Sequence, residues 1–284
     1  MPRTLVAAGT VCSMRIHRLN CGTMAGLTPT RILVVEAPTG LVLVDSGIGL
    51  QDIADPATRL GPLRHVLRPA LDPAETAVRQ IEALGLNPRD VRHIVLTHLD
   101  LDHIGGLADF PHAQVHVATE ALTWAVRTPR FLERRRYRRS QWAHGPRFTE
   151  YVYGADRWEG FRVHPLDDVC EGMLLVDLPG HALGHAGVLV PGGGGRRDGD
   201  DKGDDDQNDD DDKDVLHAGD AFYHRGQIDP TIHVPSAVGV MERTMALEPA
   251  AVTMTHARLA ALAERRQGTL DVVCAHDPSG PGGL

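Results

Sequence analysis

The chain has 284 residues, of which 42% are hydrophobic, and it carries a formal net charge of −9. That length allows one large α/β domain or two small ones. Eleven aspartates against four basic residues between Arg196 and Asp214 contribute −7 of the charge, which leaves −2 on the rest of the chain. The nearly balanced remainder excludes a general attraction to nucleic acid or to an anionic membrane surface.

The first strands are predicted from apolar and alternating runs at residues 14–19, 31–36 and 41–45, with a hairpin turn at Pro38-Thr39-Gly40. A helix is predicted to start at Asp72 as N-cap, with Pro73 at its first position and Glu75 at the capping-box position. Strands at 93–96 and 114–118 follow, and then a helix from Thr119. Strands and helices in this mixed order predict an α/β architecture with helices covering sheet faces.

Residues 127–161 are rich in arginine, with aromatic residues interleaved. One interpretation is a solvated helical face. The other is a cap over the active site that binds an anionic or amphipathic substrate. Basic and aromatic residues together also suit nucleic acid, but one short segment on a mildly acidic chain supports that poorly.

The second half of the chain predicts strands at 162–166, 173–178, 186–190, 215–218 and 271–275, and helices at 237–247 and 250–267. Residues 192–214 are dense in Asp and Gly and cannot bury apolar surface, so we predict a disordered acidic insert. We expect strands 186–190 and 215–218 to pair across it. The predicted organisation is a single domain over 14–284, preceded by a loose leader at 1–13.

The predicted location is cytoplasmic, without a membrane. Residues 1–13 hold no apolar stretch long enough for a secretory signal, and no run of about 18 apolar residues occurs. The four cysteines are scattered without a Cys-x-x-Cys pair, which is typical of idle thiols in a reducing compartment. The sequence leaves the oligomeric state open, a homodimer included.

Metal-ligand residue types are concentrated directly after the apolar run 94–96. The stretch holds His98, Asp100, Asp102 and His103, followed by Gly105-Gly106, which allows a tight turn. Imidazole and carboxylate are the ligands that zinc, manganese and iron accept.

Three more candidate ligands each follow an apolar run that we predict to be a strand. They are His181, Asp220 and His276, and Asp45 is an acidic residue at the end of an earlier predicted strand. A lone histidine is more often a solvated or satisfied side chain than a ligand. The repetition of one design, an apolar strand that ends in a ligand, indicates a shared metal site.

On these residues the sequence resembles the metallo-β-lactamase-fold superfamily of metal-dependent hydrolases. The family's His-x-His-x-Asp-His loop, later His, Asp and final His match the residues named above, over about residues 14–278. The resemblance implies a four-layer αββα sandwich of two mixed sheets with helices on the outer faces. It also implies a first metal on His98, Asp100 and His181, and a second on Asp102, His103 and His276, with Asp220 bridging. Asp45 would orient a ligand histidine, and His185 is a similar outer candidate.

Asp100 departs from the family pattern, because most members have histidine there. Aspartate replaces a neutral nitrogen with a charged oxygen, which moves the preference toward harder ions. The cofactor expectation is therefore one or two Zn²⁺ per chain, with Mn²⁺ or Fe²⁺ as alternatives. A binuclear site is favoured and a mononuclear one stays open.

Two such cations lower the pKa of a bound water toward ~7 and polarise a carbonyl, so no serine or cysteine nucleophile is needed. Asp102 or Asp220 could pass the proton to the leaving group. Tyr223 lies three residues after Asp220, where lactonases of this superfamily place a tyrosine against the substrate carbonyl; ordinary packing explains it equally well.

The predicted function is metal-dependent hydrolysis of a carbonyl ester, first of all a lactone, with a small molecule as partner. The nearest rivals are a glyoxalase-like thioesterase and a mono-iron persulfide dioxygenase. A non-catalytic metal-binding scaffold, with Asp100 as the lesion, is the alternative of another class. β-Lactam hydrolysis and RNA processing are disfavoured.

Overall fold

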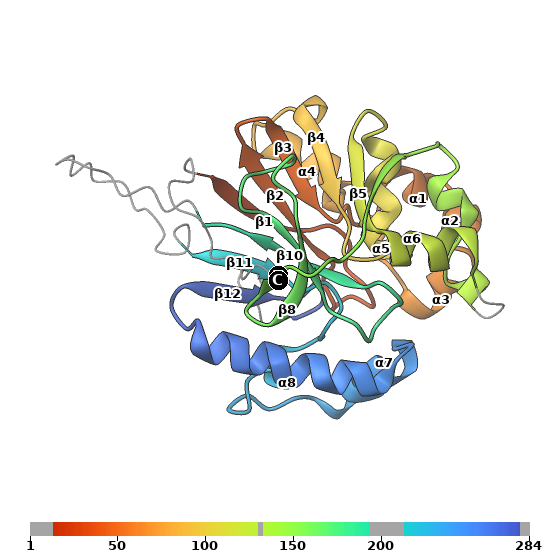
Figure 1. The fold of residues 1–284 in the computed structure, drawn as a ribbon. Helices are drawn as coiled ribbons and strands as arrows, with labels where there is room; N and C mark the ends of the chain where they lie inside the picture. The colour runs from red at the N-terminus through yellow and green to blue at the C-terminus, as the bar shows by residue number, and fades with distance from the viewer. Residues whose placement is uncertain (1–13, 130–132, 193–212, 279–284) are drawn as a thin grey trace, which may run out of the picture.

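A computed structural model describes residues 14–129, 133–192 and 213–278 (Figure 1). The predicted leader at 1–13 and most of the predicted acidic insert lie outside these residues. Within them, two six-stranded mixed sheets pack face to face. The first sheet contains, in spatial order, β1 (Arg15–Asn20), β2 (Arg31–Ala37), β3 (Gly40–Val44), β4 (Val91–Val95), β5 (Gln114–Ala118) and β6 (Arg147–Tyr151).

In the second sheet, too, strands that are consecutive in the chain are neighbours. It contains β12 (Leu270–Val273), β11 (Asp214–His217), β10 (Ala186–Val190), β9 (Leu174–Asp177), β8 (Phe161–Pro165) and β7 (Arg157–Trp158). The expected pairing across the acidic insert is confirmed, since β10 and β11 are antiparallel partners. The predicted strand bounds are correct to within one residue for most of these strands.

Strand direction brings the ends of several strands to one edge. β3 and β4 are parallel in the first sheet, and β11 and β12 are parallel in the second. β9 is antiparallel to β10, which is antiparallel to β11, so β9 and β11 run the same way. The sheets are joined at this edge by Ala186 N–H to Thr97 O at 2.9 Å and by Arg31 N–H to Ala275 O at 2.9 Å.

Alternation along the strands sorts side chains between two cores. In the second sheet Leu175 and Val188 face the first sheet, whereas Leu174 and Val176 face outward. The outward side packs on Leu259 and Leu262 of α8 (Pro249–Arg265). Burial of each such side chain contributes about 1.5–3 kcal/mol to the stability of the folded state. The core therefore fixes the two sheets relative to each other, and with them the edge described above.

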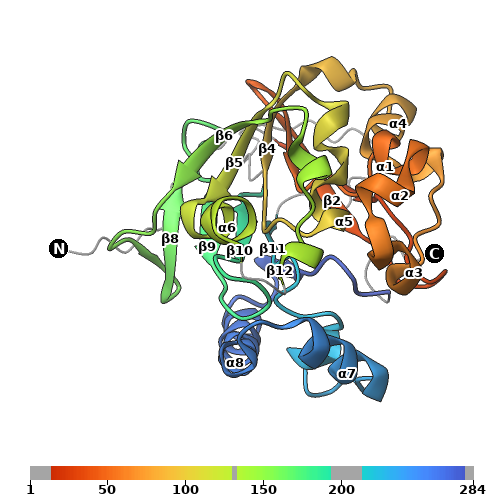
Figure 2. The same ribbon diagram turned by 90° about the vertical axis from the view of Figure 1, so that its right-hand side faces the viewer.

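The remaining helices lie outside the sheets, in two groups. Helices α7 (Ser236–Met245) and α8 lie beside the second sheet, and the other helices lie on the side of the first sheet (Figures 1 and 2). The others are α1 (Leu50–Ala54), α2 (Pro56–Arg59), α3 (Arg64–Leu67), α4 (Ala77–Ala83), α5 (Leu101–Ile104) and α6 (Thr119–Leu122). The predicted αββα sandwich is confirmed. None of the helices in the described ranges is long and apolar enough to span a membrane.

The helix start predicted at Asp72 is wrong by one turn. Asp72 caps a short 3-10 turn, Pro73–Glu75, and α4 begins only at Ala77. Glu75 does not complete a capping box, because its carboxylate accepts hydrogen bonds from Thr23 N–H at 2.6 Å and Thr23 Oγ1 at 2.8 Å. A contact across 52 residues therefore overrides the local capping pattern.

The helical-face interpretation of residues 127–161 is wrong for the described part of that span. It forms the 3-10 turns Glu133–Arg135 and Arg139–Trp142 and the strands β6 and β7. Its arginines also differ in environment: Arg127 pairs with Glu150 at the surface, whereas Arg136 is only 12% exposed. One of these arginines is therefore part of the interior.

We expect His116 on β5 to make stability depend on pH. The residue is 4% exposed, and its Nε2 lies 3.0 Å from His93 Nδ1. Burial, and to a lesser extent the His93 charge, lowers the pKa of His116 to about 4. The unfolded chain takes up this proton below about pH 6.5 and the folded one only near 4, so stability falls as the pH drops through that window. His116→Gln should reduce the loss in free energy of unfolding between pH 7 and 5 by about 1–2 kcal/mol.

Denaturant titrations at the two pH values measure this difference. His112→Gln is the matched control, since His112 is an exposed histidine nearby. Equal pH dependence of wild type and the His116 variant would contradict the assignment.

Candidate metal centre

The loop after β4 presents its ligand side chains because a one-turn helix follows at once. Asp100 stands at the N-cap of α5, and the helix carries Asp102 and His103 on buried positions. Gly105 and Gly106 are required behind it. A Cβ on Gly106 would lie 2.4 Å from Ser46 O, so only glycine allows the two loops to approach this closely.

One group of donors, called here the first ligand group, consists of His98, Asp100 and His181. Asp100 Oδ2 lies 3.3 Å from His98 Nε2 and 3.0 Å from His181 Nε2. Donors bound to one ion at about 2.0–2.1 Å in a tetrahedron lie about 3.4 Å apart, so the spacing suits a single cation. All three side chains are buried.

The second ligand group consists of Asp102, His103 and His276. Asp102 Oδ2 lies 3.7 Å from His103 Nε2 and 3.4 Å from His276 Nε2. This group is assembled from residues after β4 and after β12, more than 170 positions apart in the chain. The two strands belong to different sheets, and the packing of the sheets brings their ends together. All three side chains are again buried.

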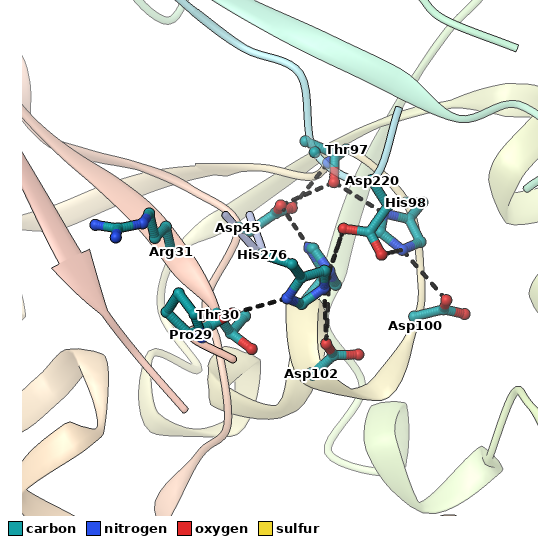
Figure 3. A network of polar contacts seen from close by, with 12 residues as sticks. Pro29, Thr30, Arg31, Asp45, Thr97, His98, Asp100, Asp102, Asp220 and His276 are labelled. Atoms are coloured by element: carbon teal, nitrogen blue, oxygen red, sulfur yellow. Dashed lines mark hydrogen bonds and ion pairs between the residues drawn. The ribbon is translucent and has the colours of Figure 1, made fainter. Parts of the chain in front are cut away.

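Asp220 lies between the two groups, with its carboxylate between the His98 and His276 rings (Figure 3). Its Oδ2 is 3.6 Å from His181 Nε2 and its Oδ1 is 3.2 Å from both His103 Nε2 and His276 Nε2. One oxygen therefore faces each group, the arrangement expected of a bridging ligand.

The donors fit a cation on an independent criterion. His98 Nε2, His103 Nε2 and Asp220 Oδ1 are buried without a hydrogen-bond partner of proper geometry among the described residues. Buried polar atoms in proteins almost always have a partner. Unpartnered nitrogen and oxygen atoms that point at one another indicate that a positive ion belongs between them.

Each ligand histidine is oriented through its other nitrogen. The Nδ1 atoms lie within 2.7–2.9 Å of an oxygen, with these partners: Thr97 Oγ1 for His98, Asp45 Oδ2 for His103, Tyr223 Oη for His181 and Pro29 O for His276. Nε2 is thereby directed into the centre in all four rings. Fixing the tautomer in this way is a common property of metal-binding histidines.

Asp45, predicted to orient a ligand histidine, lies against His103. Its buried carboxylate accepts hydrogen bonds from Thr97 N–H and Thr97 Oγ1, both at 2.8 Å, besides contacting His103. Burial alone would raise its pKa, but the charge and hydrogen bond of His103 hold the pKa below the ordinary value. The residue adopts φ 61°, a left-handed conformation that aspartate tolerates and that turns the carboxylate inward.

His185 lies behind the centre and contacts no other donor atom of the two ligand groups by hydrogen bond. Its Nδ1 is 2.9 Å from Leu178 O, so Nε2 is the acceptor for Asp220 N–H at 3.1 Å. Burial lowers its pKa well below the ordinary value, which keeps the ring neutral for that role. His185 therefore positions the Asp220 backbone.

Sequence reasoning missed two side chains of this site, Thr97 and Arg136. Arg136 Nε and Nη2 lie 2.5 Å from the two oxygens of Asp100. Burial would raise the pKa of Asp100, but the Arg136 charge holds that pKa well below its ordinary value. Burial and the same charge lower the pKa of His181 to about 4. The only local signal for Arg136 was the arginine-rich segment, which does not single out one arginine.

A model of the family described as the metallo-beta-lactamase superfamily matches residues 25–196. The chain belongs to the metallo-beta-lactamase superfamily. A protein from Mycobacterium tuberculosis named as a probable metallo-hydrolase is 45% identical over 269 residues, which cover 93% of this chain and 81% of that protein. The N-acyl homoserine lactonase AttM of Agrobacterium fabrum is 30% identical over 189 residues, 66% of this chain and 69% of AttM.

Solved structures show the same fold at lower identity. A B. thuringiensis AiiA mutant with N-decanoyl-L-homoserine bound at the active site matches with a TM-score of 0.64 and 17% identity, over 94% of each chain. An N-acyl homoserine lactone hydrolase with N-hexanoyl-L-homoserine at its catalytic metal centre gives 0.63 and 17%, over 95% of this chain and 94% of that one. The predicted superfamily is thus confirmed, and with it a metal-dependent hydrolase.

In this superfamily member a pocket of about 270 Å³ opens onto the centre. Asp100, Asp102, Asp220, His276 and Tyr223 form its floor, and Arg136 stands at the side. The remainder is largely apolar and is lined by Met24, Ala25, Leu63, Val66, Leu67, Leu101, Met241 and Met245. A polar floor under an apolar mouth suits a ligand with a reactive polar group and an apolar tail.

Replacing Asp45 by asparagine is expected to weaken metal binding by about 10–100-fold, because the partner that fixes the His103 tautomer loses its charge. Competition with a chromophoric chelator measures the affinity. Asp168→Asn, at an exposed position, serves as control. An Asp45 variant with wild-type affinity would show that the carboxylate charge does not support His103.

Proposed function

We propose that the protein hydrolyses lactones that carry an apolar chain, with divalent metal bound by donors of this centre. The observation that carries the proposal is the pocket, whose floor is the donor set and whose mouth is apolar. The activity named for AttM, at 30% identity, supports the same substrate class. The reaction adds the oxygen of water to the lactone carbonyl carbon and breaks the ring C–O bond, leaving a hydroxy acid.

When bound, a divalent cation at these donors supplies a water of lowered pKa and an electrophile for a carbonyl oxygen. The chain itself orients what surrounds it. The lone pair of His181 Nε2 points to the centre, so the proton is on Nδ1. Nδ1–H donates a hydrogen bond to Tyr223 Oη at 2.9 Å. The Tyr223 hydroxyl proton is then free to point into the pocket, where it can donate to a substrate carbonyl oxygen.

The proton released by the water must reach the alkoxide that leaves the ring. Asp102 and Asp220 are the carboxylates that line the pocket floor together with Asp100, and Asp100 is paired with Arg136. Either of the first two can accept the proton and return it to the leaving oxygen as a general acid. The apolar walls hold the chain of the substrate and keep other water away.

One observation favours the mono-iron dioxygenase as second candidate. Each donor group contains two histidines and one carboxylate, the ligand set typical of non-haem Fe²⁺ oxygenases. Metal analysis of the protein as isolated separates the two candidates: zinc supports the hydrolase, and iron with oxygen uptake on a persulfide supports the dioxygenase.

The experiment is an assay of protein reconstituted with Zn²⁺, Mn²⁺ or Fe²⁺ on lactones of increasing acyl chain length, with linear esters and thioesters in parallel. We expect ring opening of lactones, with KM falling as the chain lengthens. A protein that binds metal but turns over no lactone with any of these ions would overturn the proposal.

A matched pair of surface valines tests the apolar mouth. Val66 lines the pocket and is 72% exposed, whereas Val152 is 70% exposed and does not line it. Val66→Ser should raise KM for long-chain lactones by less than about tenfold and leave a short-chain lactone unchanged. Val152→Ser should change neither value.

A further inference from the structure

Arg136 reaches the metal centre from the segment between two 3-10 turns, and each of its three nitrogen groups is engaged. Nε and Nη2 bind the two oxygens of Asp100 in a bidentate pair, and Nη1 donates to Met245 O at 2.8 Å. Because its side chain is only 12% exposed, the guanidinium is held on fixed partners and little of it is solvated. Such a pair is the strong, directional form of the arginine–carboxylate contact.

The same guanidinium also contacts His181 Nε2, a donor atom of the first ligand group. Nη2 lies 2.5 Å from His181 Nε2. A guanidinium has donors and no acceptor, so in this contact, which is shorter than the 3.0 Å from the same nitrogen to Asp100 Oδ2, His181 Nε2 offers its lone pair to Arg136. That lone pair is the one a metal would need. Arg136 in this position and a metal on His181 therefore exclude each other.

The second ligand group is in a different state. Asp102 and His276 have no contact with Arg136 among the interactions of the described residues, and Asp220 Oδ1 faces the group at 3.2 Å without a hydrogen-bond partner there. His103 Nε2 is likewise unpartnered in the part of the chain that the structure describes. Four donors are thus available to one cation, while two of the three donors of the first group already bind a positive group.

The residue at position 100 makes this arrangement possible. A neutral imidazole there would present no pair of oxygens to a guanidinium, whereas the Asp100 carboxylate matches its two parallel donors. A fixed positive charge beside the first group also repels a divalent ion that approaches it. Asp100 and Arg136 therefore form one unit, in which the aspartate recruits an internal cation.

We propose that Arg136 is the resident cation of the first ligand group, so that the centre binds one divalent ion, at Asp102, His103, His276 and Asp220. A second ion binds only where the guanidinium has been removed. The inference rests on metal binding, as the proposed function does, but not on the identity of the substrate.

The test counts metal ions. Protein stripped with a chelator is reloaded with excess Zn²⁺, desalted and analysed for bound zinc, and Co²⁺ loading followed by absorption gives a second count. The expected result is one equivalent for wild type and for Arg136→Lys, which keeps the positive charge, and two for Arg136→Met. Arg134→Met, which removes an exposed arginine two positions earlier, is the matched control and should bind one.

Wild-type protein with two tightly bound equivalents would overturn the proposal, and so would an Arg136→Met variant that still binds one. Circular dichroism of the metal-free proteins checks that each variant folds. If Arg136→Met does not fold, Asp100→His removes the partner of the guanidinium instead and should bind two equivalents; one equivalent in that variant would again overturn it. Because no substrate is used, failure to hydrolyse lactones leaves this result standing.

Discussion

Replacing Asp220 by asparagine is expected to lower kcat/KM by more than about 100-fold for every substrate the protein hydrolyses. Loss of a group that merely supports a ligand costs about 10–100-fold, and Asp220 is itself placed as a ligand. Its two oxygens face the two groups at 3.2–3.6 Å from histidine nitrogens. Asparagine keeps the shape but replaces one oxygen by an NH₂ group, which donates hydrogen bonds and cannot bind a cation.

Steady-state kinetics and metal analysis of the same sample measure this effect. The zinc content of the variant should fall together with its activity. Asp90→Asn changes an exposed aspartate in the 3-10 turn directly before β4 and is the control for loss of one negative charge. An Asp220 variant that retains full metal content and near wild-type turnover would remove Asp220 from the donor set.

Replacing Arg59 by methionine is expected to lower the free energy of unfolding by about 3–5 kcal/mol, the range found when one partner of a buried ion pair is removed. Arg59 Nε lies 2.7 Å from Asp52 Oδ1, and Asp52 is 0% exposed. Without Arg59, Asp52 keeps Gly49 N–H at 3.0 Å and the Gln141 amide at 2.9 Å, but no cation.

Arg59 also supports the metal centre from behind, since its Nη2 donates to Gly105 O at 3.1 Å. Gly105 directly follows α5, which carries two of the ligands. We therefore expect the metal affinity of the variant to fall as well. Unlike the loss of stability, this part of the effect should be small, because Asp45 and His103 do not contact Arg59.

Urea unfolding of metal-free protein measures the stability change. The control is the surface pair Arg79–Glu82, at 2.8 Å with side chains 53% and 46% exposed, where Arg79→Met should cost less than about 1 kcal/mol. In a double-mutant cycle, Asp52→Asn combined with Arg59→Met should be less destabilised than the sum of the single changes. Additive single effects would show that the two side chains do not interact.

The candidate metal ligands could be selected from the sequence because they cluster in the stretch after one apolar run or stand singly at the end of another. A strand that ends in His181, Asp220 or His276 is a local pattern. These three strands belong to one sheet, so forming the sheet brings their ends together. The family motif then assigned them to two groups, and the structure places them in those groups. Of the four residues that orient the histidines, only Asp45 was predicted for that role, and the structure shows that its partner is His103.

Predictions from local patterns were wrong where a residue distant in the chain binds a side chain that the local pattern requires. Glu75 matches a capping box, but Thr23 takes its carboxylate and the helix starts later. The short helices α1 to α3 were not predicted at all, because a single turn carries too little periodicity to detect. Residues 127–161 had the composition of an exposed helix, yet β6 joins the first sheet by pairing with β5.

By itself the sequence determined the ligand types, their spacing, the strands that present them and the exceptional aspartate at position 100. Those properties follow from runs of a few residues and their periodicity, which folding preserves. Only the tertiary structure decided that Arg136, among the many arginines of its segment, binds Asp100 and His181. Nothing in the local pattern distinguishes that arginine, because its partners lie 36 and 45 positions away and meet it only after the two sheets have closed.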